Sequence, residues 1–285
     1  MPEGHTLHRL ARDLGHTFGG HTVRVGSPQG RFEDAARQLD GADLLGAEAW
    51  GKQLFIGFSG ERFVHVHLGL YGTFLVHDEV DEVPPPVGQV RLRLVRPASA
   101  TRPAGYGDLR GATTCALVST AERDAVVARS GPDPLRADAD PDRAWQRIRR
   151  SAAPIGTLLM DQSVLAGVGN VYRAEVLFRH RIHPLRPGRT VRVSQWRAIW
   201  DDLVVLMTEG VATGRIDTVR PEHTPEAMGR PPRVDDHGGE VYVYRRTGMP
   251  CHVCGRPVRT EVLGGRNLFW CAHCQPVFRS RAVAR

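Results

Sequence analysis

The first apolar residues of the chain recur at the three- and four-residue steps of an amphipathic helix. This spacing places them on one helical face, where they can be buried together. Gly19 and Gly20 follow directly, and glycines at this position end a helix. The pattern predicts one amphipathic helix, whose buried stripe consists of Leu7, Leu10, Leu14 and Phe18.

From His21 to about Val118 the pattern changes to short runs that are apolar or that alternate with polar residues. Glycine and proline separate these runs, as they do in an antiparallel β-sandwich. The first half of the chain is therefore predicted to be one helix plus a β-sandwich. The runs are Thr22–Val25, Leu54–Phe58, Phe63–Leu68, Thr73–Val76, Val90–Val95 and Thr113–Val118.

The second half begins with a stretch of linker composition, SGPDPLRADADP at residues 130–141, which we interpret as the domain boundary. Helical periodicity follows from Arg143 to about Gly214. From Thr218 to Glu240 the chain is rich in proline, glycine and charge, so we expect a mobile loop there.

These patterns predict an α+β protein with two domains and a smaller module. The 285 residues exceed one average domain, and 41% of them are hydrophobic, enough for a sizeable core. We expect a helix plus β-sandwich over residues 1–129, a linker over 130–141, a helical domain over 142–240 and a cysteine-bearing module over 241–285.

The charge of the chain is concentrated at its end. The net charge is +7, and residues 241–285 hold eight arginines against the single acid Glu261. The rest of the chain is therefore balanced. A balanced body with a basic end favours a contact surface for a polyanion such as nucleic acid. A generally basic protein without such a partner is the alternative interpretation.

The start of the chain, MPEGHTLHRLARDLG, lacks the apolar core of a signal peptide. No uninterrupted apolar stretch approaches the ~18 residues that a spanning helix needs. We therefore expect a cytoplasmic protein with no membrane partner. In a reducing cytosol, the five cysteines indicate metal ligands or isolated thiols before disulfides.

Four of the cysteines form two C-x-x-C pairs, which are sixteen residues apart. Two such pairs at this spacing supply four thiolates for one tetrahedral, structural zinc ion. The predicted ligands are Cys251, Cys254, Cys271 and Cys274. His252 and His273 are the alternative ligands, and a merely buried or reducible cysteine set is the alternative to a metal site. The fifth cysteine, Cys115, lies in a strand-like run and is interpreted as a buried apolar residue.

The segment between the two pairs has the pattern of a β-hairpin. Strand-like runs at Val258–Leu263 and Arg266–Trp270 flank Gly264 and Gly265, and a Gly-Gly pair is typical of a tight hairpin turn. The turn would present Arg266 at a rigid tip, where its guanidinium could contact a phosphate. An exposed, solvated arginine is the other interpretation.

Residues 158–170 read LLMDQSVLAGVGN and precede a helical run. Gly167 and Gly169 permit tight turns, and Asn170 is a favoured N-cap for the next helix. The exposed N–H groups of a helix N-terminus bind anions, and the Asn170 amide could donate to a phosphate. An ordinary structural cap is the alternative.

The chain contains a single lysine, Lys52, and the other 37 of its 38 basic residues are arginines. Arginine is effectively never deprotonated, whereas lysine can exchange a proton. Lys52 is therefore a candidate proton-transfer group, placed by Gly51 at the start of a strand. Chance retention of one lysine is the alternative.

The second residue is a proline, and an initiator methionine before a small residue is usually removed. The mature chain would then begin with the secondary amine of Pro2, which can form an iminium with an aldehyde-like carbon. The positive end of the first helix would favour the neutral, nucleophilic amine. Glu3 would lie beside it as an acid or base.

Together these features resemble the formamidopyrimidine-DNA glycosylase/endonuclease VIII family. The matching motifs follow one order along most of the chain. They are MPEG at the start, the Gly-Lys turn with Lys52, SGPDPL at 130–135, DQSVLAGVGNVY at 161–172 and GRNLFWCAHCQ at 265–275.

The resemblance implies a DNA glycosylase with AP lyase activity that acts on double-stranded DNA containing damaged bases or abasic sites. It also implies a β-sandwich, a helix–two-turn–helix domain and a zinc finger, with DNA bound between the domains of a monomeric, nucleoid-associated enzyme. Pro2 would be the Schiff-base nucleophile and Glu3 the proton donor for base release. Lys52 would transfer protons in β-elimination, and Arg266 would bind phosphate and assist δ-elimination. Asn170 and Arg129 match family contacts to DNA.

The opening MPEG resembles the endonuclease VIII branch, whereas the purine-repair branch opens with MPEL. The segment His67–Tyr71 resembles the wedge of that branch, in which Leu70 and Tyr71 fill the gap left by the flipped base. Gly69 stands where a polar residue is often found, which puts one contact to the orphan base in doubt. We expect oxidised pyrimidines as substrates.

Three alternatives stay open from the sequence. The enzyme could instead remove oxidised purines. Leu70 and Tyr71 could be ordinary core residues. The chain could also be a non-enzymatic zinc-ribbon protein that binds DNA through its basic end.

Overall fold

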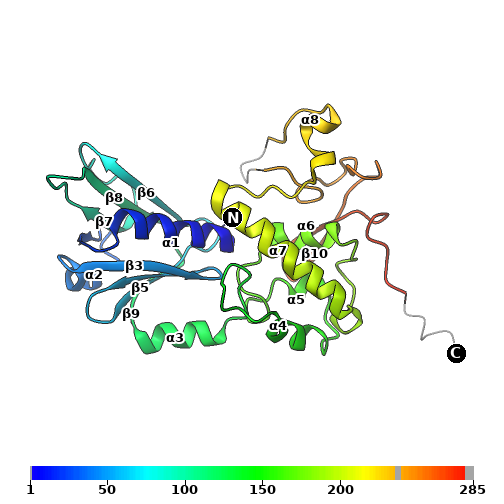
Figure 1. The fold of residues 1–285 in the computed structure, drawn as a ribbon, viewed down its shortest axis with the longest axis horizontal. Coiled ribbons are helices and arrows are strands. Elements are labelled where there is room, and N and C mark those ends of the chain that lie inside the picture. The colour runs from blue at the N-terminus through cyan, green and yellow to red at the C-terminus, as the bar shows by residue number, and fades with distance from the viewer. Residues whose placement is uncertain (1, 235–238, 280–285) are drawn as a thin grey trace. The chain divides into compact units, whose positions relative to one another are not determined.

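The computed structural model describes residues 2–234 and 239–279. The chain divides into two compact units, Met1–Arg129 and Ser130–Arg285 (Figure 1). Within the described ranges, no helix is both long enough and apolar enough to cross a membrane.

The first unit is a helix packed on two antiparallel sheets. One sheet has the strand order β1-β3-β4-β5-β9 and the other β2-β7-β8-β6. The predicted amphipathic helix and antiparallel sandwich are confirmed, and the unit has two further helices. In chain order the elements are α1 (Gly4–Phe18), β1 (His21–Thr22), β2 (Arg24–Gly26), α2 (Glu33–Leu39), β3 (Asp43–Trp50), β4 (Gln53–Phe58), β5 (Arg62–His67), β6 (Thr73–Val80), β7 (Val90–Arg96), β8 (Ala104–Arg110), β9 (Thr114–Ser119) and α3 (Thr120–Arg129).

The stripe predicted for the first helix forms part of the core of this unit. Leu7, Leu10, Leu14 and Phe18 are all buried, and α1 packs against β3, β4 and β6. Burial of each such side chain contributes about 1.5–3 kcal/mol. The helix is therefore fixed on the sheets by its apolar face.

Two strands and two helices of the first unit were absent from the predicted pattern. β8 carries glycine at positions where the packing leaves no room for a side chain: a Cβ on Gly105 would lie 2.8 Å from Thr17 Cγ2. β3 has a bulge between Leu44 and Gly46, which breaks its alternation. The helices α2 and α3 were also missed, and α3 has no buried residue.

The second unit is mainly helical and ends in a two-stranded hairpin. Its core includes the buried side chains of Tyr172 and Trp196, and the Trp196 indole donates to the carbonyl of Pro141 at 3.1 Å. In chain order the elements are α4 (Pro141–Ile148), α5 (Ile155–Leu158), α6 (Asn170–Arg179), the 3₁₀ helix η1 (Gly188–Thr190), α7 (Val193–Thr213), the 3₁₀ helix η2 (Pro221–His223), α8 (Pro225–Met228), β10 (Arg259–Leu263) and β11 (Arg266–Trp270).

The segment expected as a linker belongs in part to the core of the second unit. Residues 131–134 are buried. The Gly131 N–H donates to the carbonyl of Gln162 at 2.8 Å, and the Ala166 N–H donates to the carbonyl of Pro132 at 3.0 Å. A Cβ on Gly131 would lie 2.5 Å from the Val164 carbonyl carbon. Its proline and glycine content therefore reflects close packing as well as a connection.

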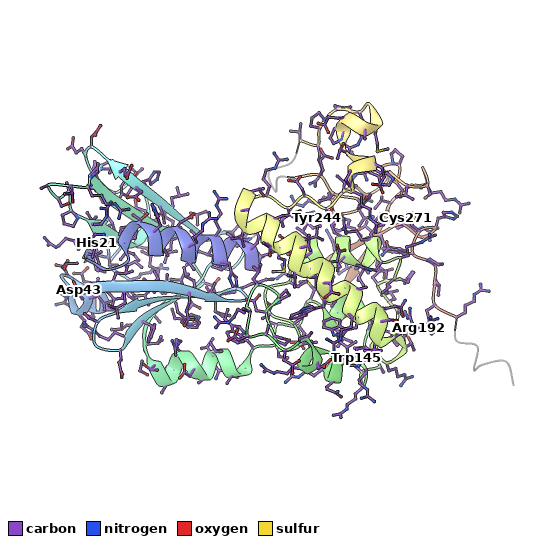
Figure 2. The ribbon with its side chains drawn as sticks, in the orientation of Figure 1. His21, Asp43, Trp145, Arg192, Tyr244 and Cys271 are labelled. Atoms are coloured by element: carbon purple, nitrogen blue, oxygen red, sulfur yellow. The ribbon has the colours of Figure 1, made fainter. Side chains whose placement is uncertain are left out.

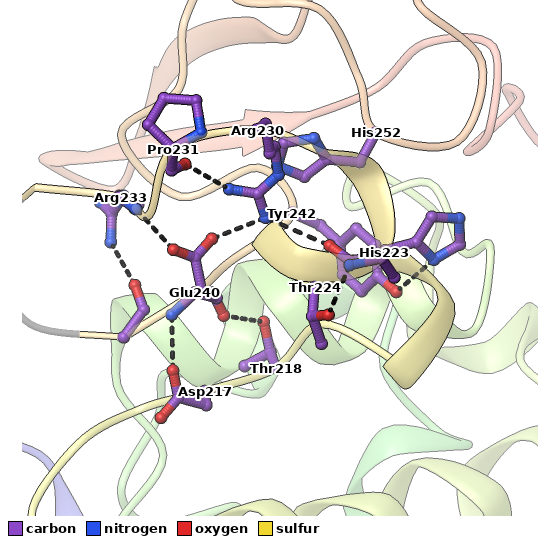
Figure 3. Close-up of polar contacts among 12 residues, drawn as sticks. Asp217, Thr218, His223, Thr224, Arg230, Pro231, Arg233, Glu240, Tyr242 and His252 are labelled. Atoms are coloured by element: carbon purple, nitrogen blue, oxygen red, sulfur yellow. Dashed lines mark hydrogen bonds and ion pairs between the residues drawn. The ribbon is translucent and has the colours of Figure 1, made fainter.

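Polar contacts join several of the described residues in the region expected as a mobile loop. Of residues 218–240, positions 235–238 lie outside the described residues. Arg230 donates to the Glu240 carboxylate at 2.7 Å, and the Glu240 N–H donates to Asp217 at 2.7 Å (Figure 3). The Thr218 N–H donates to the Glu240 carbonyl at 2.8 Å. These contacts join the start and the middle of the segment to Glu240 at its end.

A carboxylate inside α6 organises the chain that follows this loop. Glu175 is fully buried, and its oxygens accept hydrogen bonds from the N–H groups of Tyr242, Val243 and Tyr244 at 2.7–2.9 Å. The Thr218 hydroxyl donates to the same carboxylate at 2.6 Å. A buried charge is tolerated when several donors meet it. Glu175 thereby fixes the chain that enters the cysteine module.

Candidate active site and zinc centre

The four predicted cysteine ligands lie together in the second unit. Their sulfur atoms are all within 4.8 Å of one another, with Cys251 Sγ 3.9 Å from Cys274 Sγ and Cys254 Sγ 3.5 Å from Cys271 Sγ. Four thiolates about 2.3 Å from a tetrahedral zinc ion have sulfurs about 3.8 Å apart. The cluster therefore fits one structural zinc held by the four cysteines, and neither His252 nor His273 belongs to it.

The chemistry of the thiols agrees with this assignment. Burial raises the pKa of the Cys251 thiol, and a bound zinc ion would hold this sulfur as a thiolate. The isolated Cys115 is also buried, and burial raises its pKa to about 12. Cys115 is therefore an inert residue of the sandwich core, as expected.

The hairpin between the two cysteine pairs matches the prediction closely. Leu263 pairs with Arg266, and the two residues between them, Gly264 and Gly265, have φ of 58° and 72°. Positive φ at both positions is what the tight hairpin turn requires. Arg266 begins β11 beside this turn and is partly exposed.

Asn170 does not cap its helix, which corrects the prediction. The N-cap of α6 is Gly169, with extended backbone angles, and Asn170 is the first helical residue. Its buried side chain turns to the hairpin instead: Nδ2 donates to the carbonyl of Asn267 at 3.0 Å. Asn267 directly follows Arg266. The structure therefore brings Asn170 and Arg266 together through the backbone of β11.

Two further residues that the sequence analysis missed hold the cysteine module to α6. Arg173 is buried and donates to the Asn170 side-chain oxygen and, at 3.1 Å, to the Asn267 carbonyl. Gln275 accepts from the Cys271 N–H at 3.0 Å and donates to the Ile182 carbonyl at 2.9 Å. Arg173 directly follows the motif at 161–172, and Gln275 is the last residue of the motif at 265–275. The sequence could not predict their roles, because residue type alone does not indicate a hydrogen-bond partner far along the chain.

In the first unit, Pro2 and Glu3 precede α1. Glu3 is the N-cap, with an extended backbone, and its side chain is fully buried, whereas Pro2 is partly exposed. The helix thus begins at Gly4. The positive end of α1 still lies next to Pro2 and favours a neutral amine there. Burial lowers the pKa of His5 to about 4, so this imidazole stays neutral at physiological pH.

Lys52 lies in the two-residue turn between β3 and β4. Gly51 precedes it with φ of 58°, and the flanking residues Trp50 and Gln53 pair with each other. The backbone carbonyl of Lys52 accepts a hydrogen bond from Nδ1 of His67 at 2.9 Å. This contact ties the turn to the end of β5.

The packing of α1 places Pro2 and Glu3 at the same end of the sandwich as Lys52. The Gly20 N–H, just after α1, donates to the Leu44 carbonyl at the start of β3. That end of the unit carries His21 and Asp43 (Figure 2). α1 then runs along β3 (Figure 1), and the lengths of the two elements, about 22 Å and about 26 Å, are similar. The start of the helix therefore lies towards Trp50 and the turn.

Leu70 and Tyr71 lie at this end too, in the connection that follows His67. Their exposed fractions are 42% and 87%, so the interpretation of both as core residues is wrong. Two large apolar side chains that project into solvent are available for a ligand. Arg129 is the exposed last residue of α3.

The chain matches three family models, two of which are named for formamidopyrimidine-DNA glycosylase. Residues 1–115 match the formamidopyrimidine-DNA glycosylase N-terminal domain, residues 130–221 its H2TH domain, and residues 248–277 the zinc finger found in FPG and IleRS. Endonuclease 8 1 of Mycobacterium tuberculosis is 54% identical over 277 residues, covering 96% of this chain and 100% of the relative. Formamidopyrimidine-DNA glycosylase of Thermus thermophilus is 30% identical over 280 residues, covering 96% and 97%.

Solved structures show the same fold. The chain aligns with Lactococcus lactis Fpg bound to DNA containing an abasic site, with a TM-score of 0.76 and 22% identity over 96% of this chain and 100% of the other. It aligns with MutM (Fpg) of Thermus thermophilus with a TM-score of 0.69 and 27% identity, over 96% and 98%.

The sandwich, the H2TH domain and the zinc finger together define a DNA-binding repair enzyme of the base-excision pathway. The chain belongs to the formamidopyrimidine-DNA glycosylase/endonuclease VIII family and is a bifunctional DNA glycosylase and AP lyase. The alternative of a non-enzymatic DNA-binding protein is therefore wrong.

The zinc assignment predicts a selective effect of cysteine substitution. Cys271→Ser should lower the metal content from one zinc per chain to well below one, and DNA binding should fall with it, because three thiolates no longer close the tetrahedron. Cys115→Ser, the matched control, should keep its zinc. Metal analysis of the purified proteins checks both, and a full zinc complement in Cys271→Ser would contradict the assignment.

Proposed function

We propose that the enzyme removes oxidised pyrimidines from duplex DNA with the amine of Pro2 as its nucleophile, and that it then cuts the strand on both sides of the site. The observation that carries this proposal is the gathering of Pro2, Glu3 and Lys52 at the end of the sandwich where Leu70 and Tyr71 are exposed. Removal of Met1 is required, because it frees the proline nitrogen.

The first step exchanges one bond at the sugar for another. The proline nitrogen bonds to C1′ while the bond from C1′ to the base breaks, and the base leaves with the electron pair and takes a proton that Glu3 supplies. Opening of the sugar ring then gives a positively charged iminium between Pro2 and C1′. The neutral amine that this step needs is favoured by the positive end of α1.

The later steps are two eliminations. The iminium acidifies the C2′ proton; its removal expels the 3′-phosphate, and a second elimination expels the 5′-phosphate. Water then releases the sugar remnant from Pro2, which leaves a one-nucleotide gap. Lys52 is the group we assign to proton transfer, because an amine can exchange its proton where a guanidinium cannot. Arg266 would bind a phosphate and assist the second elimination.

Two observations support pyrimidine lesions over purine lesions. The chain is 54% identical to a relative named endonuclease 8 and 30% identical to one named formamidopyrimidine-DNA glycosylase. Leu70 and Tyr71, the pair that resembles the wedge of the endonuclease VIII branch, are also exposed as a wedge requires, and inserted apolar side chains stabilise an unstacked step. Removal of oxidised purines is the competing function.

The remaining contacts follow from the same assignment. Arg266 would meet the DNA backbone, and Asn170 would support that contact, because the Asn170 amide holds the strand that carries Arg266. Arg129 would add a further contact from the end of α3. The partner is double-stranded DNA with damaged bases or abasic sites, bound by a monomer in the cytoplasm at the nucleoid.

A panel of lesion-bearing duplexes tests the substrate class. Each oligonucleotide carries one oxidised pyrimidine, one oxidised purine or one abasic site, and borohydride traps the iminium as a covalent adduct. We expect trapping at the abasic site and faster single-turnover trapping at the pyrimidines than at the purines. Faster trapping at the purines would contradict the pyrimidine assignment, and trapping at none of them would contradict the imine mechanism.

The variant Lys52→Arg tests the proposed proton transfer. It keeps the positive charge and most of the side-chain length, but the guanidinium of arginine does not lose its proton in a protein. Single-turnover cleavage of an abasic-site duplex should slow by about 10²–10⁴-fold, the size of a general acid–base contribution, at nearly unchanged DNA affinity. The control Arg31→Lys, at an exposed position of the same unit, should leave both unchanged. Equal rates for wild type and Lys52→Arg would remove Lys52 from the mechanism.

A further inference from the structure

Two connections cross between the sheets of the sandwich side by side. Residues 68–72 lead from β5 to β6, and residues 111–113 lead back from β8 to β9. His67 pairs with Thr114 before the first connection, and Thr73 pairs with Arg110 after it. Both connections are therefore bounded by the same two pairs, at the end of the sandwich that carries the exposed Leu70 and Tyr71.

The two connections interlock at Gly69. This residue has φ of +69°, and a Cβ built on it would lie 2.0 Å from Oγ1 of Thr113. Thr113 is itself exposed. The hydroxyl of Thr113 therefore occupies the position from which a side chain on residue 69 would project. Gly69 is required here, because any larger residue would meet both a strained backbone and this hydroxyl.

A second close approach and the half-buried side chain of Arg91 keep Thr113 in place. A Cβ on Gly111 would lie 3.3 Å from the Tyr71 carbonyl oxygen, so the connections also touch at their other end. Arg91 donates to the carbonyls of Ala112 and Cys115 at 3.1 Å and 3.2 Å. These two contacts bracket Thr113, which limits the motion of its backbone.

We propose that Thr113 is a specificity residue that contacts the base left unpaired opposite the damaged nucleotide. The inference rests on the proposed function, in which Leu70 and Tyr71 fill the gap in the duplex. A wedge at that place puts its neighbours against the edge of the opposite base. That edge carries both donors and acceptors, and a hydroxyl can serve either. Thr113 thus supplies the polar contact that Gly69 cannot.

The test uses duplexes with one abasic site opposite each of the four bases. Single-turnover strand cleavage is measured for wild type, Thr113→Ala and Thr113→Ser. Thr101→Ala is the matched control, because Thr101 is exposed in the connection between β7 and β8, at the opposite end of the sheet. Abasic substrates contain no damaged base, so the outcome does not depend on which lesion class the enzyme prefers.

Wild type should cleave at different rates opposite the four bases. Thr113→Ala should narrow the spread of these rates by about five- to tenfold, the effect of losing one neutral hydrogen bond. Thr113→Ser should keep the spread, because it keeps the hydroxyl, and Thr101→Ala should match wild type. An equal fall in rate opposite all four bases in Thr113→Ala would overturn the proposal, as would a wild-type enzyme indifferent to the opposite base. If the lesion panel selects purines while the spread still depends on Thr113, the pyrimidine assignment fails and this inference stands.

Discussion

Burial of one apolar stripe of α1 against the sheets determines where the N-terminal amine lies. Leu7, Leu10, Leu14 and Phe18 are packed in the sandwich core, and the chain just after the helix is hydrogen-bonded to the start of β3. The helix therefore cannot slide along the sheet without exposing its stripe. Its first residues are held at the turn that contains Lys52, so the proposed nucleophile depends on core packing some distance from the reacting atoms. Catalytic groups supported in this way need little reorganisation when the substrate binds.

The second unit uses polar contacts for the same purpose. α6 carries two buried charged residues. Arg173 donates a hydrogen bond to the backbone of the zinc-finger hairpin, and Glu175 accepts hydrogen bonds from the N–H groups of residues 242–244. Gln275 adds a contact from the second cysteine pair to the chain after α6. The four-thiolate cluster closes the finger, and α6 orients it. Arg266 therefore lies on a hairpin held by a metal on one side and by a helix on the other.

Local patterns predicted the parts of this protein whose structure is local. The spacing of the cysteines, the Gly-Gly turn and the stripe of α1 each depend on neighbours in sequence, and each was confirmed. The errors arose where distant packing decides the structure. Asn170 was expected to cap a helix because its type favours that role. Its side chain instead donates a hydrogen bond to the carbonyl of Asn267, far along the chain. β8 was missed because its glycines make room for α1.

For the site residues too, the sequence predicted the chemistry of individual residues but not the packing that positions them. Pro2, Glu3 and Lys52 were proposed from their chemistry. Their location at the same end of the sandwich depends on the packing of α1 and on the register of β3 with β4, which no sequence motif predicts. Thr113 shows this most directly, because only the structure places its hydroxyl beside Gly69. Arg173 and Gln275 were missed for the same reason, since a buried arginine and a glutamine have no signature without their partners.

The presence of a single lysine makes one measurement decisive for the proposed nucleophile. Without Met1, the amines in the chain are the nitrogen of Pro2 and Nζ of Lys52, so a reduced imine must lie on one of these two. Borohydride-trapped enzyme on an abasic-site oligonucleotide is digested with protease, and the modified peptide is identified by mass spectrometry. The account predicts the sugar remnant on the peptide that begins with Pro2 and an unmodified peptide around Lys52. An adduct on Lys52, with a free Pro2, would contradict it.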